Sequence, residues 1–391
     1  MLLEIHVLQN HAPCNLNRDD TGSPKDCVFG GYRRSRISSQ CLKRSIRCSD
    51  TFKEEMGGIS LAIRTRRLPE LVKERLLKDG IDEKMAEIAC IKATGFGTDE
   101  GKEREADLNT AQTMFLTDHD IGAVASAMKE AIDEAGSLTD FKKVSAKELQ
   151  KRAVLKGWRP ITPDIALFGR MITSGAFKDV EASMQVAHAI STNKMDHEFD
   201  YFTAVDDLQK NIEDATGADM IGDVEFNSSC YYKYFSLDYD ALIYNLAGEK
   251  PNEKSMDATG KSYEESLDRA RKVASVTVQA FIKAVIYTTP NGKQNTFAAH
   301  QLPDAILIEV RQKNIPVSYA NAYISPARSH GNVNLVQDSI HKLVEHSETL
   351  NRKFNLESTM RLWFTTGPEK INGAEECESI NDLLTKLNKT L

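Results

Sequence analysis

A short run of the chain, from Lys25 to Arg47, gathers positive charge in an otherwise acidic protein. Its sequence is KDCVFGGYRRSRISSQCLKRSIR, with seven basic residues and one acid, so the run carries +6. The whole chain carries −7, which leaves −13 for the rest. A basic cluster in an acidic protein is typical of a site for a polyanion, because Lys and Arg side chains bind phosphate oxygens.

The second half of the run predicts a helix with a basic face. Ser38 and Ser39 are good N-cap residues, and the helix is expected over 40–48. Residues at i, i+3, i+4 and i+7 share a face, and here they are Gln40, Lys43, Arg44 and Arg47. The residues expected to pack inward are Ile37, Cys41, Leu42, Ser45 and Ile46.

Two further features favour phosphate binding. Gly30-Gly31 predicts a flexible turn whose backbone can approach a ligand closely. The N-terminus of the helix is expected to offer free N–H donors. A solvated basic helix face is the alternative interpretation, but the acidic remainder of the chain, the diglycine and the tandem serines argue for a phosphate-binding surface.

Enzyme signatures are absent from the sequence. It contains no H-E-x-x-H, G-x-S-x-G or Walker A motif, and its nine histidines show no ligand pairing. We therefore expect no catalytic residue, no metal and no cofactor. Asp19-Asp20 and Asp206-Asp207 are adjacent carboxylates, whose side chains generally point apart. Because Asp19 and Asp20 lie next to the basic run, a metal-dependent ribonuclease that acts on bound RNA remains the alternative.

The bulk composition describes an ordinary globular protein. The 391 residues are 41% hydrophobic and 27% charged, and the first residues, MLLEIHVLQN, lack the pattern of a signal peptide. No stretch approaches the roughly 20 apolar residues that a membrane helix requires. The seven cysteines are scattered and include no C-x-x-C pair, so free thiols and a cytoplasmic location are expected.

The spacing of apolar residues predicts an α+β fold. Leu3, Ile5 and Val7 predict a half-buried first strand, and most of 50–159 is expected to be helical. Two strands, FDYFTAVDDL and DVEFNSSCYYKYFSLD, predict a long hairpin. A short strand is expected in PDIALFGRMITSG, and a helix with a packed His188 in VEASMQVAHAISTN. Strands and helices then alternate to the end of the chain, which favours a ferredoxin-like core.

Several blocks of the sequence resemble one known family. NLNRDDTGSPKDCVFGGYRRSRISSQCLKRSIR is similar to the N-terminal signature of the backbone subunit of the type I-E CRISPR surveillance complex Cascade, the CasC family. The similarity recurs at DIALFGRMITSG, VAHAISTNKMDHEFDYFTAVDDLQ and EFNSSCYYKYFSLD, and from GKQNTFAAH through VSYANAY. These blocks keep their order and cover well over half of the chain.

The resemblance implies a fold and a set of partners. The fold would be a modified RNA-recognition (ferredoxin-like) palm over 1–55 and 161–391, with a helical fingers insertion over 56–160 and a β-hairpin thumb over about 194–232. Copies of the chain would oligomerise along a CRISPR RNA, each thumb kinking it at regular intervals. The partners would be the RNA, target DNA, further copies and other Cascade subunits, with no membrane and no catalysis by this chain.

The resemblance also implies site residues. Those that would bind RNA are Arg18, Lys25, Ser38, Gln40, Lys43, Arg44, Arg47, Met171, Tyr201, Phe202 and Thr203. Tyr201 stands where familiar members have Trp, which leaves open whether it acts as the wedge that displaces a base. Lys142 and Lys143 match a lysine-rich finger helix that contacts target DNA, whereas their spacing alone favours a solvated helix face.

Overall fold

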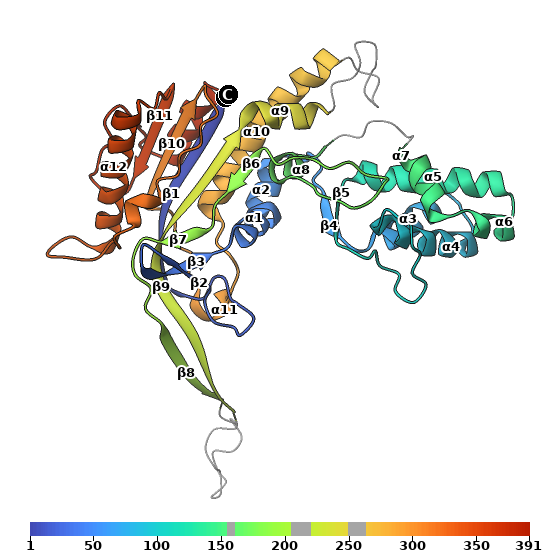
Figure 1. Cartoon of the computed structure of the whole chain (residues 1–391), viewed down its shortest axis with the longest axis horizontal. Helices are drawn as coiled ribbons and strands as arrows, with labels where there is room; N and C mark the ends of the chain where they lie inside the picture. Colours follow the sequence, from blue (N-terminus) through green and yellow to red (C-terminus); the bar gives the residue numbers. More distant parts are fainter. Residues whose placement is uncertain (155–160, 205–219, 249–262) are drawn as a thin grey trace, which may run out of the picture. The chain divides into compact units, whose positions relative to one another are not determined.

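The computed structural model of the chain describes residues 1–154, 161–204, 220–248 and 263–391, which form two compact units (Figure 1). The first, called here the sheet unit, comprises Met1–Glu55, Gln185–Asp238 and Gln279–Leu391. The second, called the helical unit, comprises Met56–Met184 and Tyr239–Val278. A large sheet combined with many helices confirms the α+β class. The assignment of palm, fingers and thumb to particular ranges stays a prediction.

The sheet unit is built on a ten-stranded sheet. The strands are β1 (Leu2–Cys14), β2 (Asp26–Phe29), β3 (Tyr32–Ile37), β6 (Met184–Val186), β7 (Ala189–Ser191), β8 (Glu198–Ala204), β9 (Met220–Asp238), β10 (Ala305–Arg311), β11 (Met360–Thr365) and β12 (Glu375–Glu376). They are ordered β12-β11-β10-β1-β9-β7-β3-β2, and β6 and β8 each pair with β9. The helices are α1 (Ser39–Cys48), α2 (Asp50–Glu55), α11 (Gln294–Phe297), α12 (Leu335–Phe354), α13 (Ile380–Asn388) and the last turns of α10 (Tyr263–Tyr287).

Strand β1 lies at the centre of the sheet, antiparallel to β10 on one side and to β9 on the other. Leu8 packs with Leu343 of α12 on one face. On the other face, Phe235, which lies opposite Ile5, packs edge-on against Phe281 of α10 at 5.3 Å. All residues from Leu2 to Leu8 are therefore buried. The predicted strand is confirmed, but the expectation that it is half-buried is wrong because helices cover both faces.

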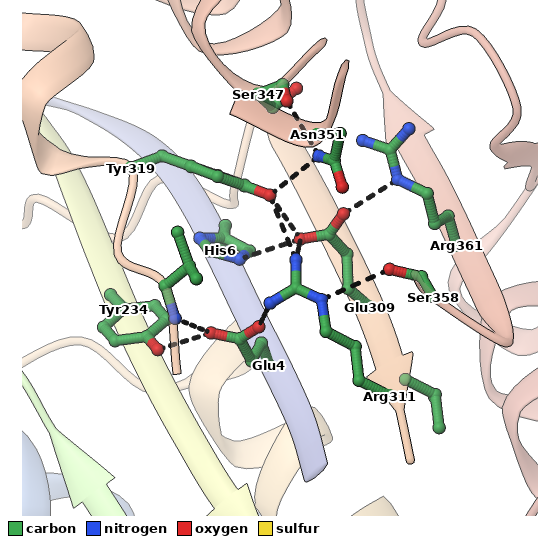
Figure 2. Close-up of polar contacts among 12 residues, drawn as sticks. Glu4, His6, Tyr234, Glu309, Arg311, Tyr319, Ser347, Asn351, Ser358 and Arg361 are labelled. Carbon is green, nitrogen blue, oxygen red and sulfur yellow. Dashed lines mark hydrogen bonds and ion pairs between the residues drawn. The ribbon is translucent and has the colours of Figure 1, made fainter. Parts of the chain in front are cut away.

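A buried polar network explains how β1 tolerates charged residues (Figure 2). Glu4 on β1 lies directly opposite Glu309 on β10, a like-charge pair that is unfavourable alone. Arg311 forms ion pairs with both carboxylates, and Arg361 of β11 donates to Glu309 at 2.8 Å. His6 lies 3.6 Å from Glu309 through Nε2. The two guanidinium groups thus balance the two carboxylates within the core.

Most helices of the helical unit pack around an apolar core. Its elements are β4 (Ile63–Thr65), α3 (Leu68–Lys78), α4 (Glu83–Thr94), β5 (Met114–Leu116), α5 (Asp118–Ala135), α6 (Leu138–Lys143), α7 (Ala146–Val154), α8 (Pro163–Phe168), α9 (Tyr239–Ala247) and the first turns of α10. Leu76, Val124, Phe141 and Leu149, from α3, α5, α6 and α7, meet in this core. Helix α5 begins with a capping box between Thr117 and Asp120.

Two predictions of secondary structure are wrong. The segment 180–193 forms the short strands β6 and β7 instead of a helix, because pairing with β3 and β9 overrides its weak helical spacing. The segment that starts at Pro163 forms helix α8 instead of a strand. Pro at the first turn and Gly169, with φ of 76°, immediately after the last are helix signals that the apolar run obscured.

Among the residues that the structure describes, no helix is both long enough and apolar enough to cross a membrane. All seven cysteines are free thiols, which confirms that expectation.

Candidate nucleic-acid interface

The basic run begins as a tight hairpin that leads into α1. Strands β2 and β3 are joined by Gly30 and Gly31, whose φ angles of 61° and 80° fit a two-residue turn that glycine favours. A Cβ atom on Gly30 would lie 2.3 Å from the carbonyl oxygen of Ile324, so only glycine fits there. The predicted turn is confirmed, and its backbone approaches another part of the chain closely.

Helix α1 presents the predicted basic face. Ser38 is its N-cap, and its hydroxyl oxygen accepts a hydrogen bond from the Cys41 backbone N–H at 3.3 Å. Leu42 and Ile46 are both buried, and Leu42 packs against residues of the sheet. The polar residues of the opposite side are exposed (Gln40 and Arg44) or half-buried (Lys43 and Arg47). Burial lowers the pKa of Lys43.

The expectation of free N–H donors at the start of α1 is wrong for two of them. The Cys41 N–H donates to the Ser38 hydroxyl, and the Ser39 N–H donates to Nδ1 of His188 at 3.1 Å. His188 is exposed instead of packed in a core. A phosphate at this end of α1 would therefore be held by side chains more than by the helix backbone.

Not every basic residue of the run faces outward. Arg34 is fully buried, and its guanidinium donates to the carbonyl oxygens of Ser191, Thr192, Tyr323 and Ile324. The guanidinium group donates to four carbonyl oxygens in the interior, so it holds β3 in place and is not exposed to a ligand at the surface. The sequence offered no signal of this, because Arg34 differs from its basic neighbours only in its tertiary surroundings.

Arg18 and Lys25 lie at the two ends of a loop that closes on itself. Arg18 forms an isolated bridge with Pro24, and the Lys25 N–H donates to the Asn17 carbonyl at 2.8 Å. The Asn17 side chain accepts the Ser38 N–H, also at 2.8 Å, so the loop is held against the start of α1. Arg18 is exposed and Lys25 half-buried.

The Asp19 carboxylate is engaged in this loop. Its Oδ1 atom accepts hydrogen bonds from Thr21 Oγ1 at 2.8 Å, Thr21 N–H at 2.9 Å and Ser23 N–H at 3.0 Å. These hydrogen bonds, that of the Thr21 side chain first, lower the pKa of Asp19. Among the described residues no group of acids, histidines or cysteines is arranged to hold a metal ion. Asp206 and Asp207 lie outside the described residues.

The predicted hairpin is confirmed as a two-stranded ribbon. Strand β8 pairs antiparallel with the first part of β9, and the ribbon extends beyond the sheet (Figure 1). Tyr201 lies opposite Asp223, and Phe202 lies opposite Gly222. Successive residues of a strand face opposite sides, so Tyr201 and Thr203 share one face while Phe202 lies on the other. Tyr201 is 65% exposed and Phe202 39%, because the Phe202 ring lies over Gly222.

Met171 is 92% exposed on a loop of the helical unit. The residue before it, Arg170, bridges to Val180 and forms a buried ion pair with Asp120 at 2.7 Å. The residue after it, Ile172, donates its N–H to Asp179 at 2.7 Å. The Met171 side chain thus projects into solvent from a loop whose backbone is held on both sides of it.

Lys142 and Lys143 end helix α6 and are both exposed. The buried Lys92 donates to the carbonyl oxygens of Lys142, at 3.1 Å, and Val144, which fixes the end of α6. Lys143 also pairs with Asp140 at 2.7 Å, whereas Lys142 forms no ion pair with any residue that the structure describes. The two lysines therefore differ in how much charge they offer to a ligand.

Solved structures share this fold. A chain described as "CRISPR RNA-guided surveillance complex, pre-nicking" matches with a TM-score of 0.78 and 26% identity, over 100% of both chains. Another, described as "CRISPR RNA-guided surveillance complex", matches with a TM-score of 0.70 and 21% identity, again over 100% of both. A comparison with curated protein sequences gave no match. The chain thus has the fold of two chains from CRISPR RNA-guided surveillance complexes. The model of the CT1975-like protein family matches residues 3–388, and the chain belongs to that family.

Proposed function

We propose that the chain is a non-catalytic CRISPR RNA-binding subunit that oligomerises along the guide RNA as the backbone of a type I-E Cascade complex. It presents the RNA for pairing with invading DNA. The observation that carries the proposal is the outward basic face of α1, in a family member whose remaining sequence is strongly acidic. The antiparallel order β10-β1-β9-β7 supports an RNA-recognition palm.

Charge separates the roles of α1 and the hairpin. The α1 face contains Lys43, Arg44 and Arg47, which suit phosphates. The described part of the hairpin, Glu198–Ala204 with 220–226, contains no Lys or Arg and four acids. It is therefore unsuited to phosphates, and Tyr201 and Phe202 would act on bases by stacking. The RNA backbone then lies on α1 while the hairpin displaces bases.

The proposal is tested by purifying the chain and analysing its nucleic acid. We expect assemblies that contain several copies of the chain and RNA of one repeat-derived length. Protein of monomeric size without RNA, when expressed together with a CRISPR array, would contradict the proposal. Incubation with complementary RNA and Mg²⁺ or Mn²⁺ tests the non-catalytic part, because cleavage that is lost in Asp20→Ala would favour the ribonuclease instead.

Replacing Tyr201 by alanine is expected to weaken RNA binding by about 1–3 kcal/mol, the value of one stacked base. Tyr201→Trp should retain or improve binding because a larger ring stacks over more area. Binding of single-stranded RNA by fluorescence anisotropy measures both. The control is Tyr244→Ala in α9, a tyrosine that is 59% exposed and outside the hairpin. If Tyr201→Ala and Tyr244→Ala lose the same RNA affinity, the hairpin is not a specific part of the RNA interface.

Replacing Lys142 by alanine is expected to weaken binding of target DNA more than replacing Lys143. Lys143 must first give up Asp140, so we expect a loss of roughly 3–5-fold for Lys142→Ala and of less than about 2-fold for Lys143→Ala. The measurement is an electrophoretic mobility shift of double-stranded DNA with the RNA-loaded assembly. A larger effect at Lys143 would show that the Asp140 pair does not limit its charge.

A further inference from the structure

His188 lies at the edge of the candidate RNA surface. It directly precedes β7, in which Ala189 pairs with Ile37 and Ile190 with Arg36 of β3. Alternate residues of paired strands share a face, so His188 lies on the same face as Arg36 and next to the Ser38 cap. The side chain is exposed. The fold thus brings a histidine from a distant segment to the beginning of α1.

A hydrogen bond determines which nitrogen of this ring carries the proton. The Ser39 backbone N–H can only donate, and it points to Nδ1 of His188 at 3.1 Å. Nδ1 must therefore be the acceptor, which leaves the proton of the neutral ring on Nε2. The slight burial of the ring, followed by the positive charges of Arg36 and Lys25, lowers the pKa of His188. At neutral pH the ring is accordingly neutral, and its Nε2–H has no hydrogen-bond partner among the residues that the structure describes.

We propose that Nε2–H of His188 donates a hydrogen bond to a phosphate oxygen of the bound RNA. The inference rests on the proposed function, because it extends the RNA surface of α1 by a residue from β7. Arg36 and Lys25 supply the charge that attracts a phosphate there, and the neutral ring adds a directed donor without further cationic repulsion. The same ring satisfies an N–H at the start of α1, so one side chain would join the helix to the ligand.

Two substitutions separate the two hydrogen bonds. In His188→Asn the side-chain oxygen stands in for Nδ1 and keeps the bond to Ser39, but the distal donor is lost. In His188→Leu both bonds are lost. We expect His188→Asn to keep the melting temperature of the wild type and to bind RNA about 5–10-fold more weakly, as suits one hydrogen bond. His188→Leu should bind as weakly and also melt earlier.

The probe is a fluorescein-labelled single-stranded RNA of mixed sequence, titrated at several salt concentrations. The salt dependence of His188→Asn should equal that of the wild type, because a neutral donor releases no counterion. If His188→Asn binds RNA as tightly as the wild type, the inference about His188 is wrong, while the proposed function still stands. The inference is also wrong if the slope of log K against log salt falls by about 0.7 in His188→Asn, because that change indicates the loss of a charged phosphate contact. If the wild-type protein binds no RNA while it is folded, the proposed function fails and this inference fails with it.

Discussion

Replacing Arg311 by methionine is expected to lower the free energy of unfolding of the sheet unit by about 3–5 kcal/mol, the cost of removing one partner from a buried ion pair. Arg311 forms ion pairs with Glu4 and, at 2.9 Å, with Glu309, and all three side chains are almost completely buried (Figure 2). Without the guanidinium group, two carboxylates remain directly opposite each other in the core.

Trp363 in β11 reports on this region, because it is buried within the sheet unit. The only other tryptophan is Trp158, so a Trp158→Phe background makes the fluorescence specific to Trp363 during urea unfolding. The control is Arg33→Met, which removes an exposed pair with Asp26 and should change stability by less than about 1 kcal/mol. If Arg311→Met and Arg33→Met lower the free energy of unfolding equally, burial of the network does not increase its contribution to stability.

The same network predicts a loss of stability in acid. Burial alone would raise the pKa of Glu309, but the adjacent His6 side chain and the charges of Arg361 and Arg311 outweigh burial and lower the pKa to about 2. Because the folded pKa lies below the unfolded value of about 4.3, the stabilisation is complete above the unfolded pKa and is lost as pH falls toward 2. The stabilisation that Glu309 contributes through this pKa difference is about 3 kcal/mol. Arg311→Met should weaken this pH dependence, as urea titrations between pH 6 and pH 3 would reveal.

Replacing Lys43, Arg44 and Arg47 together by alanine is expected to weaken RNA binding by roughly 100-fold. Each contact between a cationic side chain and a phosphate contributes about 1 kcal/mol net, and three of them about 3 kcal/mol. The slope of log K against log salt should fall by about 2, since each lost phosphate contact on a single strand removes about 0.7. Fluorescence anisotropy at several salt concentrations measures both quantities.

A matched control separates a specific contact from general electrostatics. Arg352, Lys353 and Lys389 are exposed near the ends of α12 and α13, and their replacement by alanine changes the net charge equally. We expect the control triple variant to bind RNA nearly as well as the wild type. If both triple variants lose the same affinity and slope, the positive charge of α1 acts only at long range and the helix is not the RNA site.

Local sequence was sufficient for much of the site. The cap at Ser38, the basic stripe of α1, the turn at Gly30-Gly31 and the β8–β9 hairpin were all predicted from spacing within a few residues. Helix periodicity, caps and turns depend on neighbours in the chain, so the sequence expresses them directly. The resemblance to Cascade backbone subunits added the roles proposed for Met171 and Lys142, which spacing alone does not indicate.

Only the tertiary structure decided which polar residues face a ligand. Arg34 lies inside the same basic run as Arg33, yet four carbonyl oxygens from residues about 160 and 290 positions away enclose it. His188 looked like a core residue of a helix, but strand pairing places it at the start of α1. By itself the sequence determined an acidic α+β protein with a basic face on the helix that follows Ser38 and with a long hairpin. Burial and long-range pairing, which depend on segments far apart in the chain, determined which of its charges lie at the surface.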